Sequence, residues 1–196
     1  MLTTKKKFWV NNIIVVKKIV IFASGNGTNT QNIINYFRNS NVIVSKIICN
    51  YSEAKVLDIA QKENIESIII SKNQLDSDDV LNLLKQLEPD LIVLAGFLLK
   101  IPKSITDIFK IVNIHPSLLP KFGGRGMYGM NVHKAVIESF EEESGITIHW
   151  VNENYDDGNI IKQYKCNVSA LDTPETLSDK VRNLELNYPS VIKNIL

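Results

Sequence analysis

The stretch from Asn113 to Pro120, "NIHPSLLP", places an amide and an imidazole two residues apart at the end of an apolar run. Side chains at positions i and i+2 of a strand point the same way, so Asn113 and His115 should project together. Pro116 should end the strand there. An amide donor beside a titratable ring is suited to stabilising an oxyanion. Taken alone, His115 could also be a hydrogen-bonded histidine at a strand end.

The stretch "YDDGN", residues 155–159, adds two carboxylates, Asp156 and Asp157. An aspartate in a turn usually serves the turn itself. Amide, imidazole and carboxylate together are nevertheless the set needed for formyl or acyl transfer to an amine, because a carboxylate can keep the imidazole charged and help to move a proton. The sequence shows no nucleophilic serine or cysteine elbow and no metal-ligand spacing. We therefore predict direct attack by the acceptor amine, without a metal.

The stretch "SGNGTN", residues 24–29, separates an expected strand from an expected helix. Glycines allow a sharp turn there, and a helix N-terminus offers free N–H groups to an anion. The dinucleotide fingerprint is absent because Thr30 stands where it needs a third glycine, and no Gly-Lys-Ser/Thr follows as in a P-loop. Two interpretations stay open: an ordinary tight turn, or a phosphate site for a mononucleotide at the ligand edge of a parallel sheet.

Apolar runs that alternate with amphipathic segments predict the scaffold that positions these residues. The pattern is typical of an α/β fold: a Rossmann-like, mostly parallel mixed sheet with helices on both faces. A short turn between the last two strands predicts an antiparallel hairpin near the end. The expected strands are 18–24, 42–50, 65–71, 90–96, 111–115, 145–153 and 160–168, and the expected helices are 30–39, 53–64, 76–90 and 174–186.

Length and charge limit the classes of protein that are possible. The chain has 196 residues, 44% of them hydrophobic, and a formal net charge of +1. We predict one domain over 17–196 and an N-terminal extension over 1–16. The balanced charge argues against a nucleic-acid partner, and no apolar run approaches the ~20 residues of a membrane span. Cys49 and Cys166 fit no metal or redox spacing, so we expect a cytoplasmic protein whose partners are small molecules.

From about residue 18 to the C-terminus, the sequence closely resembles the folate-dependent phosphoribosylglycinamide formyltransferases of purine synthesis. "NIHPSLLP" is shared across folate formyltransferases and deformylases, whereas "SGNGTN" and the short length select this family. The resemblance implies transfer of a formyl group from 10-formyltetrahydrofolate, as co-substrate, to the amine of glycinamide ribonucleotide. The motifs that carry it are "SGNGTN", "VLAGF", "NIHPSLLP", "GITIHWV", "YDDG" and "LELNYP".

The resemblance also implies roles for individual residues. The catalytic residues would be Asn113, His115 and Asp156. The residues that bind the ribonucleotide would be Gly27, Thr28 and Asn29 at the phosphate, Glu185 at the ribose hydroxyls, and Arg182 on the phosphate side. The folate site would be formed by Phe97, Leu98, Leu99, Ile101 and Asn113, mainly through backbone groups in the segment 95–101. The family often has arginine where Leu99 stands, so only a backbone or packing role carries over there, and His149 matches a strand histidine near the site.

Three other functions compete with this one. The enzyme that formylates initiator Met-tRNA usually carries a further C-terminal domain and a basic surface, and the enzyme that hydrolyses formyl-folate usually carries an N-terminal regulatory domain. A nucleotide-binding module without catalysis would keep "SGNGTN" but would not need Asn113, His115 and Asp156 together. Finally, four glycines in the stretch 121–131 predict a mobile flap over the folate site.

Overall fold

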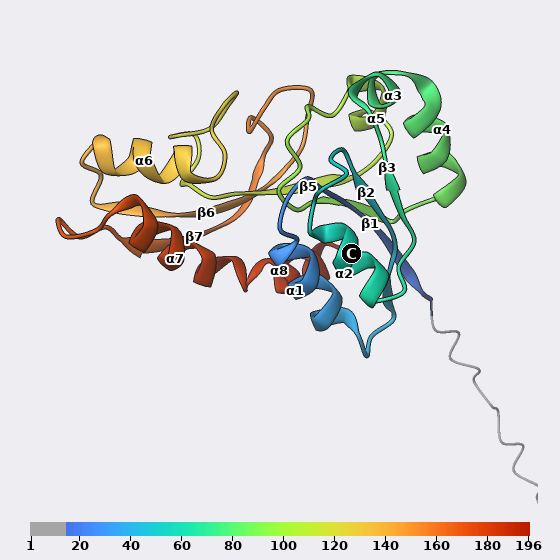
Figure 1. Ribbon diagram of the computed structural model, residues 1–196, viewed down its shortest axis with the longest axis horizontal. Coiled ribbons are helices and arrows are strands. Elements are labelled where there is room, and N and C mark those ends of the chain that lie inside the picture. The colour runs from blue at the N-terminus through green and yellow to red at the C-terminus, as the bar shows by residue number, and fades with distance from the viewer. Residues whose placement is uncertain (1–14) are drawn as a thin grey trace, which may run out of the picture.

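The computed structural model describes residues 15–196, and its centre is a seven-stranded sheet with the order β3-β2-β1-β4-β5-β6-β7 (Figure 1). Strands β1 to β5 are parallel, β6 is antiparallel to β5, and β7 is antiparallel to β6. The strands are β1 (Lys17–Ala23), β2 (Val42–Cys49), β3 (Ser67–Ile69), β4 (Leu91–Leu94), β5 (Ile111–His115), β6 (Glu143–Trp150) and β7 (Ile160–Asn167). This arrangement confirms the predicted mixed sheet and its late hairpin.

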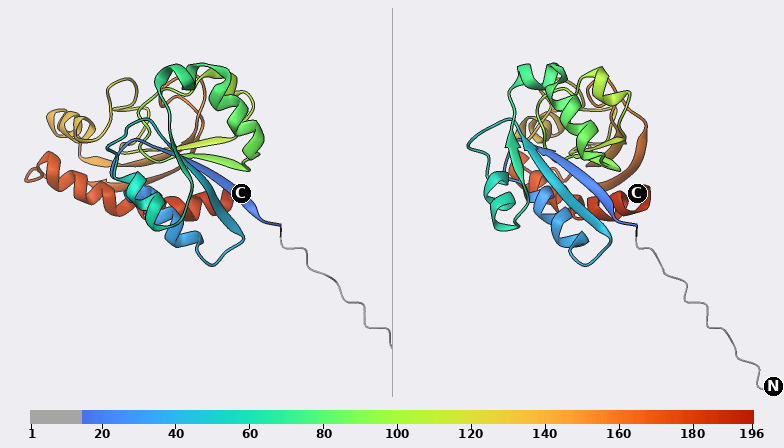
Figure 2. Two further views of the ribbon diagram at one scale, coloured as in Figure 1. Left: turned by 45° about the vertical axis from the view of Figure 1, so that its right-hand side comes forward. Right: turned by 90° about the vertical axis from the view of Figure 1, so that its right-hand side faces the viewer.

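Helices cover both faces of the sheet (Figure 2). The helices are α1 (Thr28–Phe37), α2 (Val56–Lys62), α3 (Lys72–Asp76), α4 (Asp78–Leu87), α5 (Lys103–Thr106), α6 (Met130–Glu138), α7 (Pro174–Glu185) and α8 (Tyr188–Ile195). The side chains of β1 point alternately to the two faces of the sheet, and both faces are apolar. Ile19 and Ile21 belong to one hydrophobic cluster, and Val20 and Phe22 belong to the other. Helices α1, α2, α6, α7 and α8 contribute to the first cluster, and α3, α4 and α5 to the second.

The order of the strands places the ligand edge of the sheet. The chain moves outward from β1 to β2 and β3, and then returns to place β4 on the other side of β1. Open α/β sheets bind ligands beyond the carboxyl ends of the strands at such a reversal. The segments that follow β1, β4 and β5 all start from this edge, so "SGNGTN", "VLAGF" and "NIHPSLLP" converge there.

Helix α8 contacts the sheet next to this ligand edge. Tyr188 is fully buried, and its hydroxyl lies 3.2 Å from the carbonyl oxygens of both Leu94 and Val112. Burial raises the pKa of Tyr188 well above its ordinary value, so the hydroxyl keeps its proton and remains a donor. The "NYP" part of the C-terminal motif therefore supports the end of β4 and the start of β5.

The structure differs from the predicted elements mainly in its helices. The residues of α5, α6 and α8, and those of α3 before Asp76, were not predicted as helical, so the helix after Thr173 is not the last one. The predicted flap 121–131 is two residues too long, because α6 begins at Met130. Helices α3 and α5 have five and four residues, too few to show a helical period. The predicted N-terminal extension falls almost entirely outside the described residues.

Candidate active site

A cavity of about 750 Å³ opens at the carboxyl edge of the sheet. It lies within the size range of small-molecule sites, and loops after β1, β4, β5 and β6 form it together with α6 and α7. The residues that line it and were predicted from the sequence are Asn29, Phe97, Leu98, Leu99, Ile101, Asn113, His115, Asp156, Arg182 and Glu185. Two segments far apart in the sequence, at the ends of β5 and β6, thus contribute to one site.

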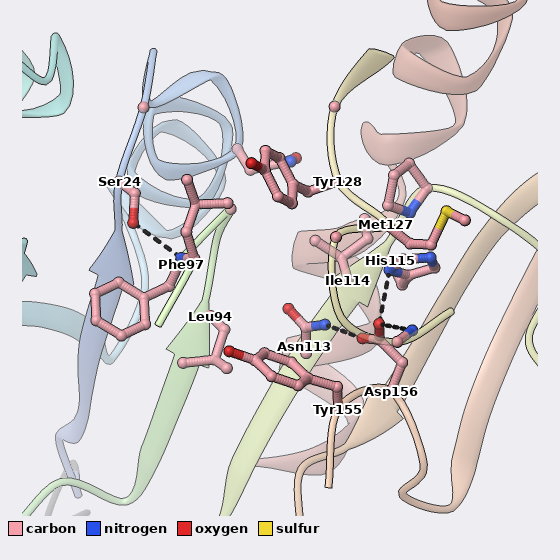
Figure 3. A pocket seen from close by; sticks show the side chains of 18 of the residues that line it. Ser24, Leu94, Phe97, Asn113, Ile114, His115, Met127, Tyr128, Tyr155 and Asp156 are labelled. Atoms are coloured by element: carbon pink, nitrogen blue, oxygen red, sulfur yellow. Dashed lines mark hydrogen bonds and ion pairs between the residues drawn. The ribbon is translucent and has the colours of Figure 1, made fainter. Parts of the chain in front are cut away.

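Asp156 lies at the centre of a polar cluster on the cavity wall (Figure 3). Its Oδ2 is 3.4 Å from Nδ1 of His115, and its Oδ1 accepts a 3.4 Å hydrogen bond from Nδ2 of Asn113. The structure therefore brings together the amide, the imidazole and the carboxylate that the sequence predicted. Both contacts are long for N–H···O hydrogen bonds, so Asp156 holds neither Asn113 nor His115 tightly.

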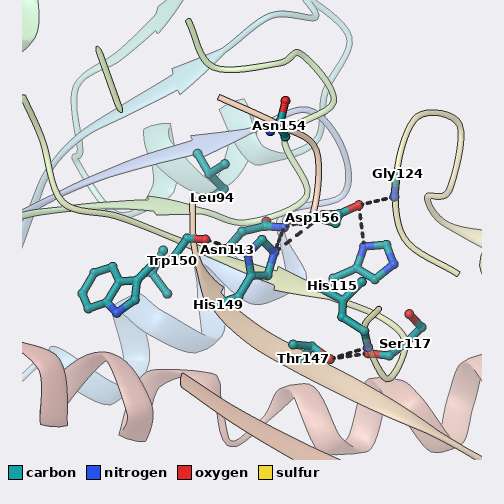
Figure 4. Close-up of polar contacts among 12 residues, drawn as sticks. Leu94, Asn113, His115, Ser117, Gly124, Thr147, His149, Trp150, Asn154 and Asp156 are labelled. Carbon is teal, nitrogen blue, oxygen red and sulfur yellow. Dashed lines mark hydrogen bonds and ion pairs between the residues drawn. The ribbon is translucent and has the colours of Figure 1, made fainter. Parts of the chain in front are cut away.

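His149 is a fourth member of this cluster (Figure 4). In the β5–β6 ladder it lies directly opposite Asn113, and its Nε2 is 3.1 Å from Nδ2 of Asn113 and 3.6 Å from Oδ1 of Asp156. Its Nδ1 lies 2.8 Å from the carbonyl oxygen of Trp150. A carbonyl can only accept, so Nδ1 carries a hydrogen, and in the neutral ring Nε2 accepts from Asn113. His149 therefore orients the Asn113 amide.

Main-chain groups of the glycine-rich segment hold the other two members. Nε2 of His115 lies 2.7 Å from the carbonyl oxygen of Phe122, so this nitrogen must carry a hydrogen and donate it. The N–H of Gly124 donates to Oδ2 of Asp156 at 2.9 Å. The segment 121–129 thus contacts both His115 and Asp156, and its residues 124–129 also line the cavity.

Burial and neighbouring charges shift the pKa values of His115 and Asp156 in opposite directions. Burial lowers the pKa of His115, and the neighbouring Asp156 and the Phe122 carbonyl oppose this without cancelling it. Burial raises the pKa of Asp156, but His149, His115 and the Gly124 N–H together bring it below its ordinary value. Asp156 is therefore ionised at neutral pH, and it is the main group that favours the charged form of His115.

The turn after His115 is held by hydrogen bonds as well as by its prolines. The Thr147 hydroxyl donates to the carbonyl of Ser117 at 2.7 Å and accepts from the N–H of Leu119 at 2.9 Å (Figure 4). Gln163 on β7 donates to the same hydroxyl and to the Leu119 carbonyl. The hairpin β6–β7 thus fixes the direction in which the chain leaves β5.

The turn that carries Asp156 requires a glycine two residues later. A Cβ on Gly158 would lie 1.7 Å from the carbonyl oxygen of Trp150, so no larger residue fits there. Asp156 itself has φ +52°, in the left-handed region that aspartate and asparagine adopt more readily than most residues. Asp157 is exposed, and its carboxylate accepts from Asn152 and Asn154 within the same turn.

One end of the cavity is polar and lies at the start of α1. Gly27 precedes the helix with φ +75°, and no side chain caps the helix N-terminus. Nδ2 of Asn29 donates to Oε2 of Glu185 on α7 at 3.0 Å, which joins the two helices across the cavity. Burial raises the pKa of Glu185, although Asn29 and Arg182 oppose the shift. Gly27 and Thr28 are close in sequence but do not line the cavity wall.

The other end of the cavity is mainly apolar. It is formed by the segment after β4, where the Leu98 N–H donates to the Ser24 hydroxyl at 3.0 Å and the Phe97 ring packs edge-on against Phe22. Ile101 is buried, while Leu98 is largely exposed to the cavity and solvent. The Tyr155 ring reaches from the hairpin turn toward Leu94 (Figure 3). Such walls suit a flat, largely apolar ring system.

A sequence comparison decides the family. The family model for formyl transferases matches residues 17–192. The chain belongs to the formyl transferase family. Its fold agrees, because the solved phosphoribosylglycinamide formyltransferase of Anaplasma phagocytophilum superposes with a TM-score of 0.82 at 33% identity, over 91% of this chain and 86% of that one. The enzyme of Bacillus halodurans gives 0.81 at 31% identity, over 92% and 95%.

Curated relatives of this formyl transferase carry the same name as those structures. The phosphoribosylglycinamide formyltransferase of Bacillus subtilis is 34% identical over 92% of this chain and 95% of its own length. The chloroplastic enzyme of Arabidopsis thaliana is 37% identical over 86% of this chain. The chain spans only 61% and 57% of the Arabidopsis thaliana and Vigna unguiculata proteins. The resemblance inferred from the motifs is confirmed.

The structure adds residues of the formyl transferase site that were not assigned from the sequence. His149 was noted without a role, and its contact with Asn113 depends on a strand register that the sequence does not show. Tyr155, Tyr128 and His133 also line the cavity. His133 lies on helix α6, which was not predicted. The apolar residues Val132 and Val136, four positions apart, could have indicated this helix. Within residues 15–196, no group of three His, Cys, Asp or Glu side chains could hold a metal ion.

Proposed function

We propose that this formyl transferase moves a formyl group from 10-formyltetrahydrofolate to the amine of glycinamide ribonucleotide in purine biosynthesis. The observation that carries the proposal is the cluster of Asn113, His115 and Asp156 between a polar and an apolar end of one cavity. The names of the relatives support the choice of reaction and acceptor. No helix among residues 15–196 is long and apolar enough to cross a membrane, and a cytoplasmic location stays a prediction.

In this proposal Asn113 and His115 stabilise the oxyanion that forms when the amine attacks. The Asn113 amide, and Nδ1 of His115 in its imidazolium form, each hold a hydrogen toward Asp156 at 3.4 Å, and a contact of that length is easily exchanged for a shorter one to a developing charge. Asp156 favours the imidazolium form of His115 and helps to pass the amine proton toward the leaving group. His149 keeps the amide of Asn113 in place through its 3.1 Å contact.

The two ends of the cavity suit the two substrates. Formyl-folate supplies the formyl group, and we propose that its ring system binds against Phe97, Leu98, Leu99 and Ile101. The uncapped start of α1, with Gly27, Thr28 and Asn29, would receive the phosphate of the ribonucleotide. Glu185 would accept from the ribose hydroxyls, with Arg182 nearby. Gly25, Asn26 and Asn29 line the cavity wall but Gly27 and Thr28 do not, so the phosphate contacts of those two residues rest on the resemblance alone.

The choice of acceptor tests the proposed function directly. Purified protein and 10-formyltetrahydrofolate are mixed in turn with glycinamide ribonucleotide, its dephosphorylated nucleoside, Met-tRNA and water alone. We expect rapid transfer only to the ribonucleotide, because binding energy from the remote phosphate orients the amine. Rapid loss of the formyl group in water alone would instead identify a hydrolase, and equal rates with and without the phosphate would exclude the proposed acceptor site.

The segment 121–129 should become less mobile when folate binds. Its first part is held at Gly124, whose N–H donates to Asp156. Residues 125–129 line the cavity and include two glycines at positive φ, Gly126 and Gly129. We expect amide hydrogen exchange over 125–129 to slow at saturating concentrations of a non-reactive folate analogue. Exchange in α4, on the far side of the sheet, serves as the control. Equal exchange with and without ligand would make this segment an ordinary surface loop.

A further inference from the structure

A buried histidine in the cavity has no role in the reaction as proposed. His133 lies on α6, is only 4% exposed, and lines the same cavity as His115 and Arg182. Its Nδ1 is enclosed and has no hydrogen-bond partner among residues 15–196. Because buried polar atoms are nearly always paired, an unpaired one at a cavity wall calls for an explanation.

The position of His133 is set by the packing of α6. Val132 and Val136 are buried in the hydrophobic cluster beneath the helix, and Leu177 and Val181 of α7 belong to the same cluster. His133 follows Val132 and so lies about a quarter turn around the helix from it. An apolar side chain could fill this place without leaving a polar atom unpaired, so the core does not require histidine here.

The surroundings determine which ring nitrogen carries the hydrogen. Burial lowers the pKa of His133, and the positive charge of Arg182 and the neighbouring His115 lower it further, so the ring is neutral. A buried N–H without an acceptor is rarer than a buried acceptor without a donor. The hydrogen therefore resides on Nε2, since Nδ1 is the enclosed nitrogen. The side chain then presents an N–H donor to the cavity, and this donor has no acceptor among the described residues.

We propose that His133 binds the acceptor ribonucleotide by donating its Nε2–H to one of the ligand's oxygen atoms. The oxygen lies between the catalytic cluster at His115 and the cationic side chain of Arg182, both of which line the same cavity. This inference rests on the proposed function, because it assigns a further contact within the same ribonucleotide site. It gives the Nε2–H of His133 a partner that is present only in the complex, while Nδ1 stays enclosed and unpaired.

The test compares two substitutions of His133, one that removes the N–H donor and one that keeps it. His133→Phe fills the same space without an N–H, and His133→Gln retains an N–H near the position of Nε2. Glycinamide ribonucleotide is titrated into each protein by calorimetry without folate. We expect the Phe variant to bind about tenfold more weakly and the Gln variant to bind nearly as the wild type does. The melting temperature of the Phe variant should equal or exceed that of the wild type, because its side chain buries no unpaired nitrogen.

Further measurements keep the inference falsifiable. Lys134→Gln, at the exposed neighbouring position, is the matched control and should leave affinity unchanged. If the Phe variant does not fold, His133→Asn replaces it, because its shorter amide cannot reach the Nε2 position and must weaken binding as well. The dephosphorylated nucleoside shows which oxygen is bound: the difference between wild type and variant disappears if His133 contacts the phosphate, and persists if it contacts the ribose or amide.

Two results would overturn the inference. The Phe or Asn variant could bind the ribonucleotide as tightly as the wild type does, or it could lose thermal stability while affinity stays unchanged, which would make His133 a structural residue. Both differ from failure of the proposed function, in which the wild-type protein itself would neither bind the ribonucleotide nor transfer a formyl group to it.

Discussion

Replacing Asp156 with asparagine should abolish most of the formyl transfer activity and leave the fold intact. Asparagine has nearly the same shape, adopts the left-handed backbone conformation at φ +52° equally well, and can still accept from the Gly124 N–H. It cannot favour the imidazolium form of His115 or receive a proton. We expect kcat to fall by roughly 10²–10⁴, the usual contribution of a positioned acid or base. Steady-state kinetics at neutral pH measure the loss.

The adjacent Asp157 provides a matched control for this experiment. Its carboxylate is exposed and contacts only Asn152 and Asn154 within the turn. Asp157→Asn should therefore keep most of the activity and the same melting temperature. An inactive Asp157 variant beside an active Asp156 variant would show that the catalytic carboxylate had been assigned to the wrong residue of the pair.

Asn113→Ala is expected to have the next largest effect. The substitution removes the donor that we assign to the oxyanion, and loss of one such donor typically lowers kcat by roughly 10²–10³. The KM for either substrate should change little, because the contact strengthens only as charge develops. Initial rates over a range of both substrates separate the two parameters. Near-normal turnover would remove Asn113 from the mechanism.

The same variant needs a control for stability, because Asn113 also donates to His149 and Asp156. His149→Gln is a useful companion, since a glutamine oxygen can still accept from the Asn113 amide. If His149 acts only by orienting that amide, the Gln variant should retain far more activity than Asn113→Ala. Melting temperatures of both variants show whether a loss of rate reflects unfolding.

Much of the fold could be predicted because its signals are local. Continuous apolar strands, alternating helices and the short turn at "YDDGN" were sufficient for the mixed sheet. Proximity of Asn113 and His115 followed from the period of a strand, and Pro116 marked its end. The short helices α3 and α5 gave no comparable signal, because they span too little sequence to show a period.

Other parts of the site depend on contacts that a sequence does not display. The pairing of His149 with Asn113 depends on the register between β5 and β6, and the 27 residues between the two strands include a helix that was not predicted. Phe122 contacts His115, and Gly124 contacts Asp156, through main-chain atoms. The amino-acid types at positions 122 and 124 therefore do not indicate these contacts. The roles assigned to individual residues by resemblance stay predictions until the variants are measured.

The double use of the segment 121–129 has a consequence for side reactions. One short stretch of backbone both lines the cavity and holds His115 and Asp156 through Phe122 and Gly124. If this stretch lifts to admit a substrate, His115 loses the acceptor of its Nε2–H and Asp156 loses a donor in the same movement. On that prediction, opening the cavity to water would also displace the groups that activate a formyl carbonyl. The formyl donor would then be protected from wasteful hydrolysis.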